Sequence, residues 1–369
     1  MEPLVQLLAD LVAIPSMNPM GRDRRGPLYS EAAAADYVAQ YLRSRGVDVA
    51  VSEVVPGRPN VVGSIHVGAP STLLLEAHLD TVHADSMEVD PSLIRGDRLY
   101  GRGACDTKAS LAAFIFAACL ARPSQLRHNL ILAAVADEEY RFTGAVHAVN
   151  QGLRADYGIV GEPTLLHIVR AHKGVTRWRI TTTGQAAHSA YPERGENAIY
   201  LMGHVLVRME EYAQRLRTAT PYGILGTPTA SVGVIEGGQA VNIVPDRCWI
   251  EVDRRTVPGE HTGQVLDDVR ALLADIPHVT LDVPHIDVPG MDVPSESPIV
   301  RLLQGGITSV LGQAHVETAN YATDAGVYNS HGIPTVVFGP GDIAQAHTSS
   351  EFVELNQVRQ AVEILQRIL

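Results

Sequence analysis

The sequence predicts an α/β protein, in which helices cover a mostly parallel sheet and a smaller ferredoxin-like α+β domain is inserted. Short segments rich in Val, Ile and Leu alternate with helical stretches, a pattern typical of a buried parallel sheet. The middle of the chain instead shows the order β-α-β-β-α-β, which is typical of a compact split α+β unit. The length of 369 residues, with 46% hydrophobic and 19% charged residues, suits a folded chain of two domains.

Apolar residues at helical spacing predict two amphipathic helices over 4–14 and 31–42, and Gly46 ends the second. An apolar run over 111–121 predicts a third helix. The strands of the parallel sheet are predicted over 72–75, 130–135, 157–160 and 335–338. Ligand sites in such sheets lie beyond the carboxyl ends of the strands.

The inserted domain is expected over 173–288, between a first part of the main domain at 1–172 and a second part at 289–369. A Pro- and Asp-rich stretch over 284–298 marks its end. Its predicted strands cover 174–183, 230–235, 242–252 and 279–283, and its predicted helices cover 196–216 and 263–274.

Composition excludes several classes of protein. The chain has 29 Lys and Arg against 41 Asp and Glu, a net charge of −12, so we expect no nucleic-acid partner. The apolar run over 111–121 is too short to span a bilayer, so no membrane segment is expected. The first residues lack the features of a signal peptide, which favours the cytoplasm. The 3 cysteines are expected to be small buried side chains.

Residues suited to metal chemistry are expected at or just beyond the carboxyl ends of the strands of this sheet. His78 and Asp80 come directly after the strand predicted over 72–75, so that one could bind a metal while the other orients it. Asp106 lies in a Gly-bounded loop over 101–108. Each also has a plainer interpretation: the His78–Asp80 pair as a solvated or capping pair, and Asp106 as the N-cap of the following helix.

More carboxylates follow at the next strand ends. Asp137, Glu138 and Glu139 are adjacent, so their mutual repulsion needs a cation or solvent to compensate it. Glu162 ends the next strand, and His347 follows the last. We expect all of these groups at one edge of the sheet.

Two imidazoles and three or more carboxylates in one crevice make a mixed nitrogen and oxygen site. Such a site suits a pair of Zn²⁺ ions, or exchangeable Co²⁺ or Mn²⁺, better than an all-oxygen Ca²⁺ or Mg²⁺ site. A carboxylate outside the ligand set is then free to act as a base.

The combined motifs resemble the metallopeptidase family that includes acetylornithine deacetylase, succinyl-diaminopimelate desuccinylase, aminoacylase and bacterial glutamate carboxypeptidase. The similarity covers essentially the whole chain. The motifs are His78-x-Asp80, Gly101-Arg102-Gly103-x-x-Asp106-x-Lys108, Asp137-Glu138-Glu139, Gly161-Glu162-Pro163, and Gly339-Pro340-Gly341 with His347.

The resemblance implies that Asp106 bridges two zinc ions. His78 and Glu162 would complete one metal site, and Glu139 and His347 the other. These assignments rest on the family pattern and not on spacing alone.

The resemblance also assigns roles beside the metals. Glu138 would be the general base and Asp80 the partner that orients His78. The peptide bond between Asp106 and Thr107 is expected to be cis. Ala109 departs from the family, because many relatives have glycine there.

Substrate contacts are expected from both parts of the chain. His188 matches a segment that, in dimeric relatives, reaches the partner's active site, and we expect a homodimer formed through the inserted domain. Asn242 and Arg255 match residues that approach the substrate, with Arg255 suited to bind a carboxylate. A surface salt bridge remains an alternative for Arg255, and a surface or core position for His188. Gly339 and Gly341 are further substrate-binding candidates.

The leading hypothesis is hydrolysis of the amide bond of an N-acyl amino acid. A dipeptidase or carboxypeptidase acting on short peptides is the alternative within the family, and a catalytically inactive binding protein is a remote one. The segment from Gly339 to Ala344 superficially matches a dinucleotide loop, but too little sequence follows it for the required βαβ unit.

Overall fold

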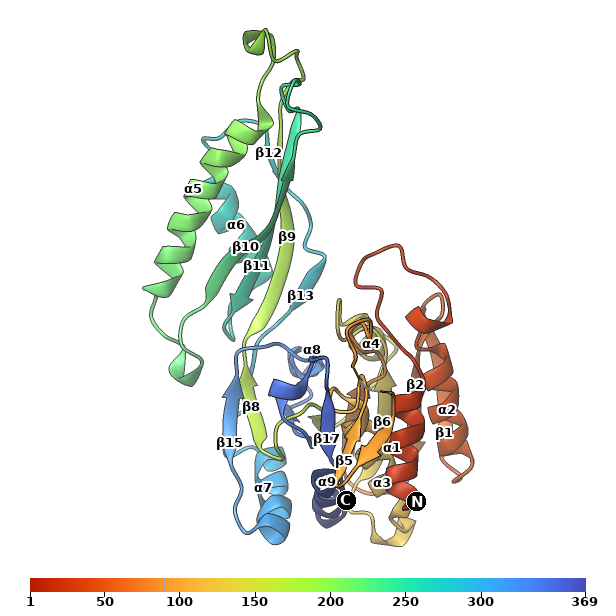
Figure 1. Cartoon of the computed structure of the whole chain (residues 1–369). Coiled ribbons are helices and arrows are strands. Elements are labelled where there is room, and N and C mark those ends of the chain that lie inside the picture. The colour runs from red at the N-terminus through yellow and green to blue at the C-terminus, as the bar shows by residue number, and fades with distance from the viewer. Residues whose placement is uncertain (89) are drawn as a thin grey trace. The chain divides into compact units, whose positions relative to one another are not determined.

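The computed structural model describes residues 1–88 and 90–369, which form two compact units (Figure 1). Unit 1 consists of 1–171, 292–318 and 323–369, and unit 2 of 172–291 with 319–322. The insertion expected from the sequence, 173–288, begins one residue after unit 2 does and ends three residues before its main segment does.

The centre of unit 1 is a parallel sheet, as predicted. Its strands β3 (Thr72–His78), β6 (Asn129–Val135), β7 (Tyr157–Val160) and β16 (Thr335–Val337) lie in the order β6-β3-β7-β16. His78 pairs with Val135, and Glu76 pairs with Val160. The carboxyl ends of these strands therefore meet at one edge of the sheet.

The borders of this sheet are antiparallel, which the sequence pattern did not predict. β1 (Asp48–Val55) pairs with β2 (Arg58–Ile65), and β2 pairs with β6. On the other side, β16 pairs antiparallel with β8 (Ile168–His172). The short strands β14 (Met291–Asp292) and β15 (Val316–Ala319) both lie next to β8.

Helix α3 (Lys108–Leu120) is buried on nearly every side, which explains its unbroken apolar sequence. It packs against β3, α1 (Pro3–Ala13) and α9 (Leu355–Ile368). The other α-helices of unit 1 are α2 (Ala32–Arg43), α4 (Thr143–Asn150), α7 (Pro298–Leu311) and α8 (Asp324–Ser330). Within the described residues, no helix has both the length and the apolar character needed to cross a bilayer.

A separate small sheet corrects one expectation. β4 (Leu93–Arg95), β5 (Arg98–Tyr100) and β17 (Phe352–Glu354) form a three-stranded antiparallel sheet. The loop over 101–108 follows β5, so it does not extend from a strand of the main sheet, as the sequence had suggested. Asp106 reaches that edge from the start of α3 instead.

Unit 2 has the predicted ferredoxin-like topology. Its strands lie in the order β10-β11-β9-β12, with α5 and α6 on one face (Figure 1). The strands are β9 (Gly174–Thr183), β10 (Thr229–Gly237), β11 (Arg247–Thr256), β12 (Val279–Leu281) and β13 (Ile286–Val288), and the helices are α5 (Ala198–Arg217) and α6 (Thr262–Leu272).

The strand predicted over 242–252 starts too early. β11 begins at Arg247, and the residues before it form a turn in which the Ile243 N–H donates to the Ala240 carbonyl. Pro245 has no N–H to donate to a ladder, which favours a loop at this point.

Candidate metal centre

Five loop or strand-end residues converge at the carboxyl edge of the parallel sheet. His78 is the last residue of β3, Glu139 follows β6 and Glu162 follows β7. Asp106 comes from the loop before α3, and His347 from the connection between β16 and β17. The structure thus brings together the five residues that the sequence proposed as metal ligands.

Asp106 lies between the two histidines. Its Oδ1 is 3.1 Å from Nε2 of His78, and its Oδ2 is 3.3 Å from Nε2 of His347. Nε2 of His78 is also 3.8 Å from Oε1 of Glu162, and Nε2 of His347 is 3.2 Å from Oε2 of Glu139. Each imidazole therefore faces Asp106 and one further carboxylate.

Glu138 belongs to the same cluster. Ligand atoms of His78, Glu138 and Glu162 lie within 4.8 Å of one another, as do those of His78, Asp106 and Glu139. Glu138 is only 9% exposed, so its carboxylate is positioned inside the crevice.

Glu351 is a buried glutamate whose side chain holds the Asp106 loop. The sequence analysis did not identify it. Oε1 of Glu351 accepts the backbone N–H groups of Cys105, at 2.9 Å, and Asp106, at 3.1 Å. Its Oε2 pairs with Nη1 of Arg102 at 2.6 Å. Thr107 is the N-cap residue of α3, so the capping interpretation of Asp106 is wrong. No spacing pattern in the sequence marks Glu351.

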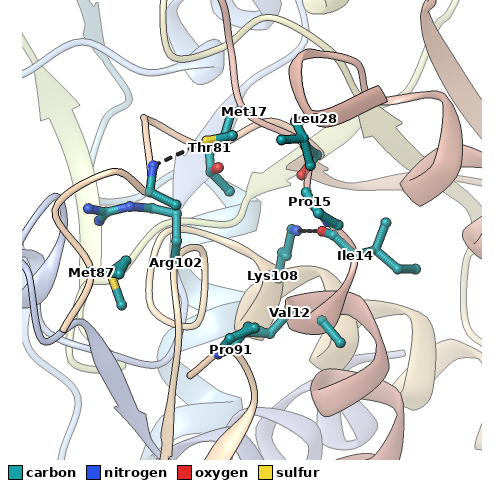
Figure 2. Close-up of a pocket in the computed structure, with 13 residues that line it drawn as sticks. Val12, Ile14, Pro15, Met17, Leu28, Thr81, Met87, Pro91, Arg102 and Lys108 are labelled. Atoms are coloured by element: carbon teal, nitrogen blue, oxygen red, sulfur yellow. Dashed lines mark hydrogen bonds between the residues drawn. The ribbon is translucent and has the colours of Figure 1, made fainter. Parts of the chain in front are cut away.

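The Asp106–Thr107 peptide bond is cis, as the resemblance implied. On the far side of this bond, the buried ammonium of Lys108 donates to the Ile14 carbonyl at 2.7 Å (Figure 2). It also donates to the Leu11 carbonyl at 3.0 Å. These bonds join the first turn of α3 to the end of α1. Lys108 also lines a mainly apolar cavity of about 250 Å³, whose described lining includes none of the predicted site residues.

Asp80 orients His78 through its backbone. Nδ1 of His78 lies 2.8 Å from the Asp80 carbonyl oxygen, which can only accept, whereas the nearest Asp80 carboxylate oxygen is 3.6 Å away. Nδ1 therefore donates its proton to that carbonyl, so Nε2, which faces Asp106 and Glu162, is the nitrogen that would bind a metal once its own proton is displaced.

The Asp80 carboxylate was expected to orient His78, but it binds the turn after β6 instead. Its Oδ1 accepts the backbone N–H of Glu138 at 3.1 Å, and its Oδ2 accepts that of Glu139 at 3.2 Å. Asp80 therefore positions the turn that carries both glutamates.

The electrostatics of the cluster favour a cation. Burial and neighbouring carboxylates raise the pKa of Glu138 and Glu162 well above the ordinary value, and burial with the charge of Asp106 raises the pKa of Glu139 to about 7. Burial alone would raise the pKa of Asp106, but hydrogen bonds from His347 and His78 outweigh it and hold that pKa below its ordinary value.

The donor set fits metal ions. Among the described residues, no lysine or arginine forms an ion pair with Glu138, Glu139 or Glu162, although all three are largely or fully buried. Buried carboxylates without a cationic partner are costly, and bound metal ions would supply the missing charge. The mixture of imidazole and carboxylate suits Zn²⁺, Co²⁺ or Mn²⁺.

The two glycines proposed as substrate contacts are packed against the protein. A Cβ on Gly339 would lie 2.2 Å from Oγ of Ser110, and a Cβ on Gly341 would lie 2.6 Å from Sγ of Cys105. Gly341 also has a φ of +99°, a backbone conformation that favours glycine.

The remaining predicted residues belong to unit 2. His188 and Asn242 are exposed and lie on adjacent loops, because the Ser189 N–H donates to the Asn242 carbonyl at 3.1 Å. Arg255 forms two hydrogen bonds to Asp253 of the same strand, at 2.8 and 3.2 Å. The salt bridge left open for Arg255 is therefore present.

Comparisons with known proteins agree with this arrangement. Residues 74–369 match the model of peptidase family M20/M25/M40. The chain is 33% identical to acetylornithine deacetylase of Proteus mirabilis, over 99% of this chain and 95% of the relative.

Two solved structures have the same fold. An M20 family metallo-carboxypeptidase from Sulfolobus solfataricus has a TM-score of 0.81 at 20% identity, with 100% of this chain and 98% of that chain covered. A dinuclear metal binding peptidase of the M20 family from Bacillus subtilis has a TM-score of 0.68 at 16% identity, with 99% and 96% covered.

The first prediction concerns metal content. The His78→Ala variant removes the imidazole that both ligand groups share, so it should bind fewer metal ions than the unmodified chain. His66 is exposed and lies outside the cluster, and the His66→Ala variant should keep the full metal content. Elemental analysis after dialysis measures both, and equal metal content in the two variants would contradict the assignment.

The second prediction concerns pH. Hydrogen bonds to Asp106 and Glu139 raise the pKa of His347 to about 10, so its imidazole is protonated at neutral pH when no metal is bound. A metal must displace that proton, so apparent affinity should rise with pH, about tenfold per unit for each proton displaced, until about pH 10. Chelator competition at pH 6.5 and 7.5 tests this, and an affinity independent of pH would refute it.

Proposed function

Because this chain belongs to peptidase family M20/M25/M40, we propose that its metal-dependent hydrolysis of amide bonds uses two zinc ions and removes the acyl group from an N-acyl amino acid. The observation that carries the proposal is the convergence of two histidines and four carboxylates in one cluster, in which His347 is the exposed member. Similarity to an acetylornithine deacetylase over nearly the whole chain supports an acetylated amino acid such as acetylornithine as substrate. A dipeptidase or carboxypeptidase is the second candidate, since a carboxypeptidase shares the fold.

In the proposed centre, Asp106 would bridge two ions. His78 and Glu162 would hold one ion, and Glu139 and His347 would hold the other. The distances support this division, because each histidine faces Asp106 and the carboxylate assigned to the same ion. A dinuclear M20 peptidase of the same fold supports the count of two, with Co²⁺ or Mn²⁺ as substitutes for Zn²⁺.

Glu138 is the proposed general base. Bound metal ions would polarise the scissile carbonyl and make the attacking water more acidic. The Glu138 carboxylate takes a proton from that water and then donates it to the leaving amine. Its burial supports this role, since a raised pKa brings a carboxyl group closer to the operating pH of the enzyme.

Unit 2 supplies the proposed contacts to the rest of the substrate. Arg255 binds the free carboxylate of the amino acid, because its planar guanidinium donates two parallel hydrogen bonds. It already holds a carboxylate, that of Asp253, in this manner. Asn242, Gly339 and Gly341 are further substrate contacts, and His188 stabilises the oxyanion of the tetrahedral intermediate.

We further propose a homodimer formed through unit 2. Within the described part of this unit, β10 is an edge strand that pairs only with β11. Large apolar side chains are exposed on β10 and on α5, including Val234 at 47%, Ile235 at 54% and Val207 at 56%. An open edge flanked by exposed apolar groups suits isologous pairing with a second copy.

The third prediction tests the function. Purified protein loaded with Zn²⁺ or Co²⁺ should release amino acid from at least one of N-acetylornithine, other N-acetyl amino acids and N-succinyl amino acids. The Glu138→Gln variant should lose turnover but keep its metal, since Glu138 is a base and not a ligand in this proposal. Cleavage of dipeptides alone would favour the peptidase, and an active Glu138→Gln variant would exclude the proposed base.

The fourth prediction tests whether His188 acts on the partner's site. The His188→Ala and Glu138→Ala variants should each be inactive, but a mixed dimer has one site with both groups intact. Mixing should therefore restore activity in about one site of two in each mixed dimer. Native mass spectrometry verifies subunit exchange, and exchange without recovered activity would exclude the arrangement.

A further inference from the structure

The Asp80 carboxylate holds the turn that carries Glu138 and Glu139. The position of that turn therefore depends on the groups that hold Asp80. Asp80 is fully buried and accepts the backbone N–H of each glutamate, one on each carboxylate oxygen. A rotation of this carboxylate would move both N–H donors. The position of the proposed base and of one proposed metal ligand therefore depends on whatever fixes Asp80.

Asn18 holds Asp80 by a short hydrogen bond, while Nη2 of Arg58 lies further away, 3.9 Å from Oδ2 of Asp80. Its Nδ2 donates to Oδ2 of Asp80 at 2.7 Å and to Oδ1 of Asp137 at 2.9 Å. An amide group has two N–H donors, so each carboxylate receives one. Asn18 itself is anchored, because its Oδ1 accepts the N–H of Met20 at 2.8 Å and its N–H donates to the carbonyl of Thr81, also at 2.8 Å.

Arg58 and Glu31 form a buried ion pair, and Arg58 also binds Asp137. Nη1 of Arg58 lies 2.8 Å from Oδ1 of Asp137, and Nε of Arg58 donates to Glu31, at 2.8 Å to the nearer oxygen. The Asp137 carboxylate is therefore fixed independently of the metal cluster. Asn18 connects this fixed group to Asp80, so the chain of contacts runs Glu31, Arg58, Asp137, Asn18, Asp80.

We propose that Asn18 is a positioning residue for the metal centre: through Asp80 it sets the turn that carries Glu138 and Glu139. This inference rests on the proposed function for the roles of those glutamates. Asn18 hydrogen-bonds none of the five proposed ligands. Its effect must therefore pass through the two carboxylates it donates to: that of Asp80, which accepts the N–H groups of both glutamates, and that of Asp137, which directly precedes Glu138.

The substitution Asn18→Ala leaves Asp80 with one hydrogen-bond donor fewer, and its remaining link to Asp137 is the Arg58 guanidinium, 3.9 Å from its Oδ2. Loss of an outer partner of a metal site typically weakens metal binding by about 10–100-fold, and we expect a loss in that range for one of the two ions. With metal saturating, kcat should also fall by about tenfold, since the base is displaced. KM should stay within about twofold, because the proposed substrate contacts lie elsewhere.

Asn129 provides a matched control. It is also a buried asparagine whose side chain bridges local groups, accepting from Val67 and Ala69, but it lies at the opposite end of β6. Asn129→Ala should lower the melting temperature and leave metal affinity within about twofold of the unmodified chain. A structural role alone would make the two variants behave alike.

The experiment is a chelator-competition titration of the full chain with Zn²⁺, with far-ultraviolet circular dichroism to verify folding. Asn18→Ser, which keeps one donor, serves if Asn18→Ala fails to fold, and should bind Zn²⁺ more weakly than the unmodified chain. Native affinity in a folded Asn18 variant would overturn the proposal. Weakened binding in a protein that hydrolyses no N-acyl amino acid would refute only the proposed function, because the titration uses no substrate.

Discussion

Carboxylates buried close together without a lysine or arginine partner are the constraint on which this structure depends. Glu138, Glu139 and Glu162 lie in one crevice, and among the described residues only imidazoles face them as cationic partners. Removing such groups from water costs several kcal/mol each unless a cation compensates. A bound cation would offset this cost, so the buried carboxylates and the metal ions stabilise each other.

The parallel sheet creates this constraint. Strands β6, β3 and β7 are parallel neighbours whose carboxyl ends lie at the same edge of the sheet, so residues at or just after each end are brought close together. Supports from distant parts of the chain then prevent the carboxylates from moving apart. Glu351 holds the Asp106 loop, and Asp80 holds the turn after β6. Both supports act on backbone N–H groups, which fixes the chain and leaves the reactive side chains free.

The sequence predicted what depends on local pattern. Apolar periodicity located β7 and β9 at their observed bounds, and it located α3 to within three residues at its start. It did not find β1, which has only exposed and half-buried positions, or β2, whose sequence includes arginine, proline, asparagine, glycine and serine. It placed β11 too early, because an apolar stretch around Ile243 resembles a strand although the backbone turns there.

The metal cluster was predictable because its members follow strands or sit in recognisable motifs, and the structure brings them together. The supporting residues were not. These residues, Glu351, Asn18 and Arg58, contact partners that lie tens to hundreds of positions away in the sequence. Only the folded backbone brings each of them next to its partner. The role of Asp80 also needed geometry, since the distances show that its carbonyl, and not its carboxylate, is the closer partner of His78.

The proposed metal centre is a single cluster in unit 1, in which Asp106 would bridge two metal ions. The most direct measurement is an anomalous difference map from a zinc-soaked crystal, recorded at the zinc absorption edge. We expect two peaks, each about 2.0–2.2 Å from an Asp106 oxygen, one also bound to Nε2 of His78 and the other to Nε2 of His347. A single peak, or two peaks that do not share Asp106, would contradict the proposed centre.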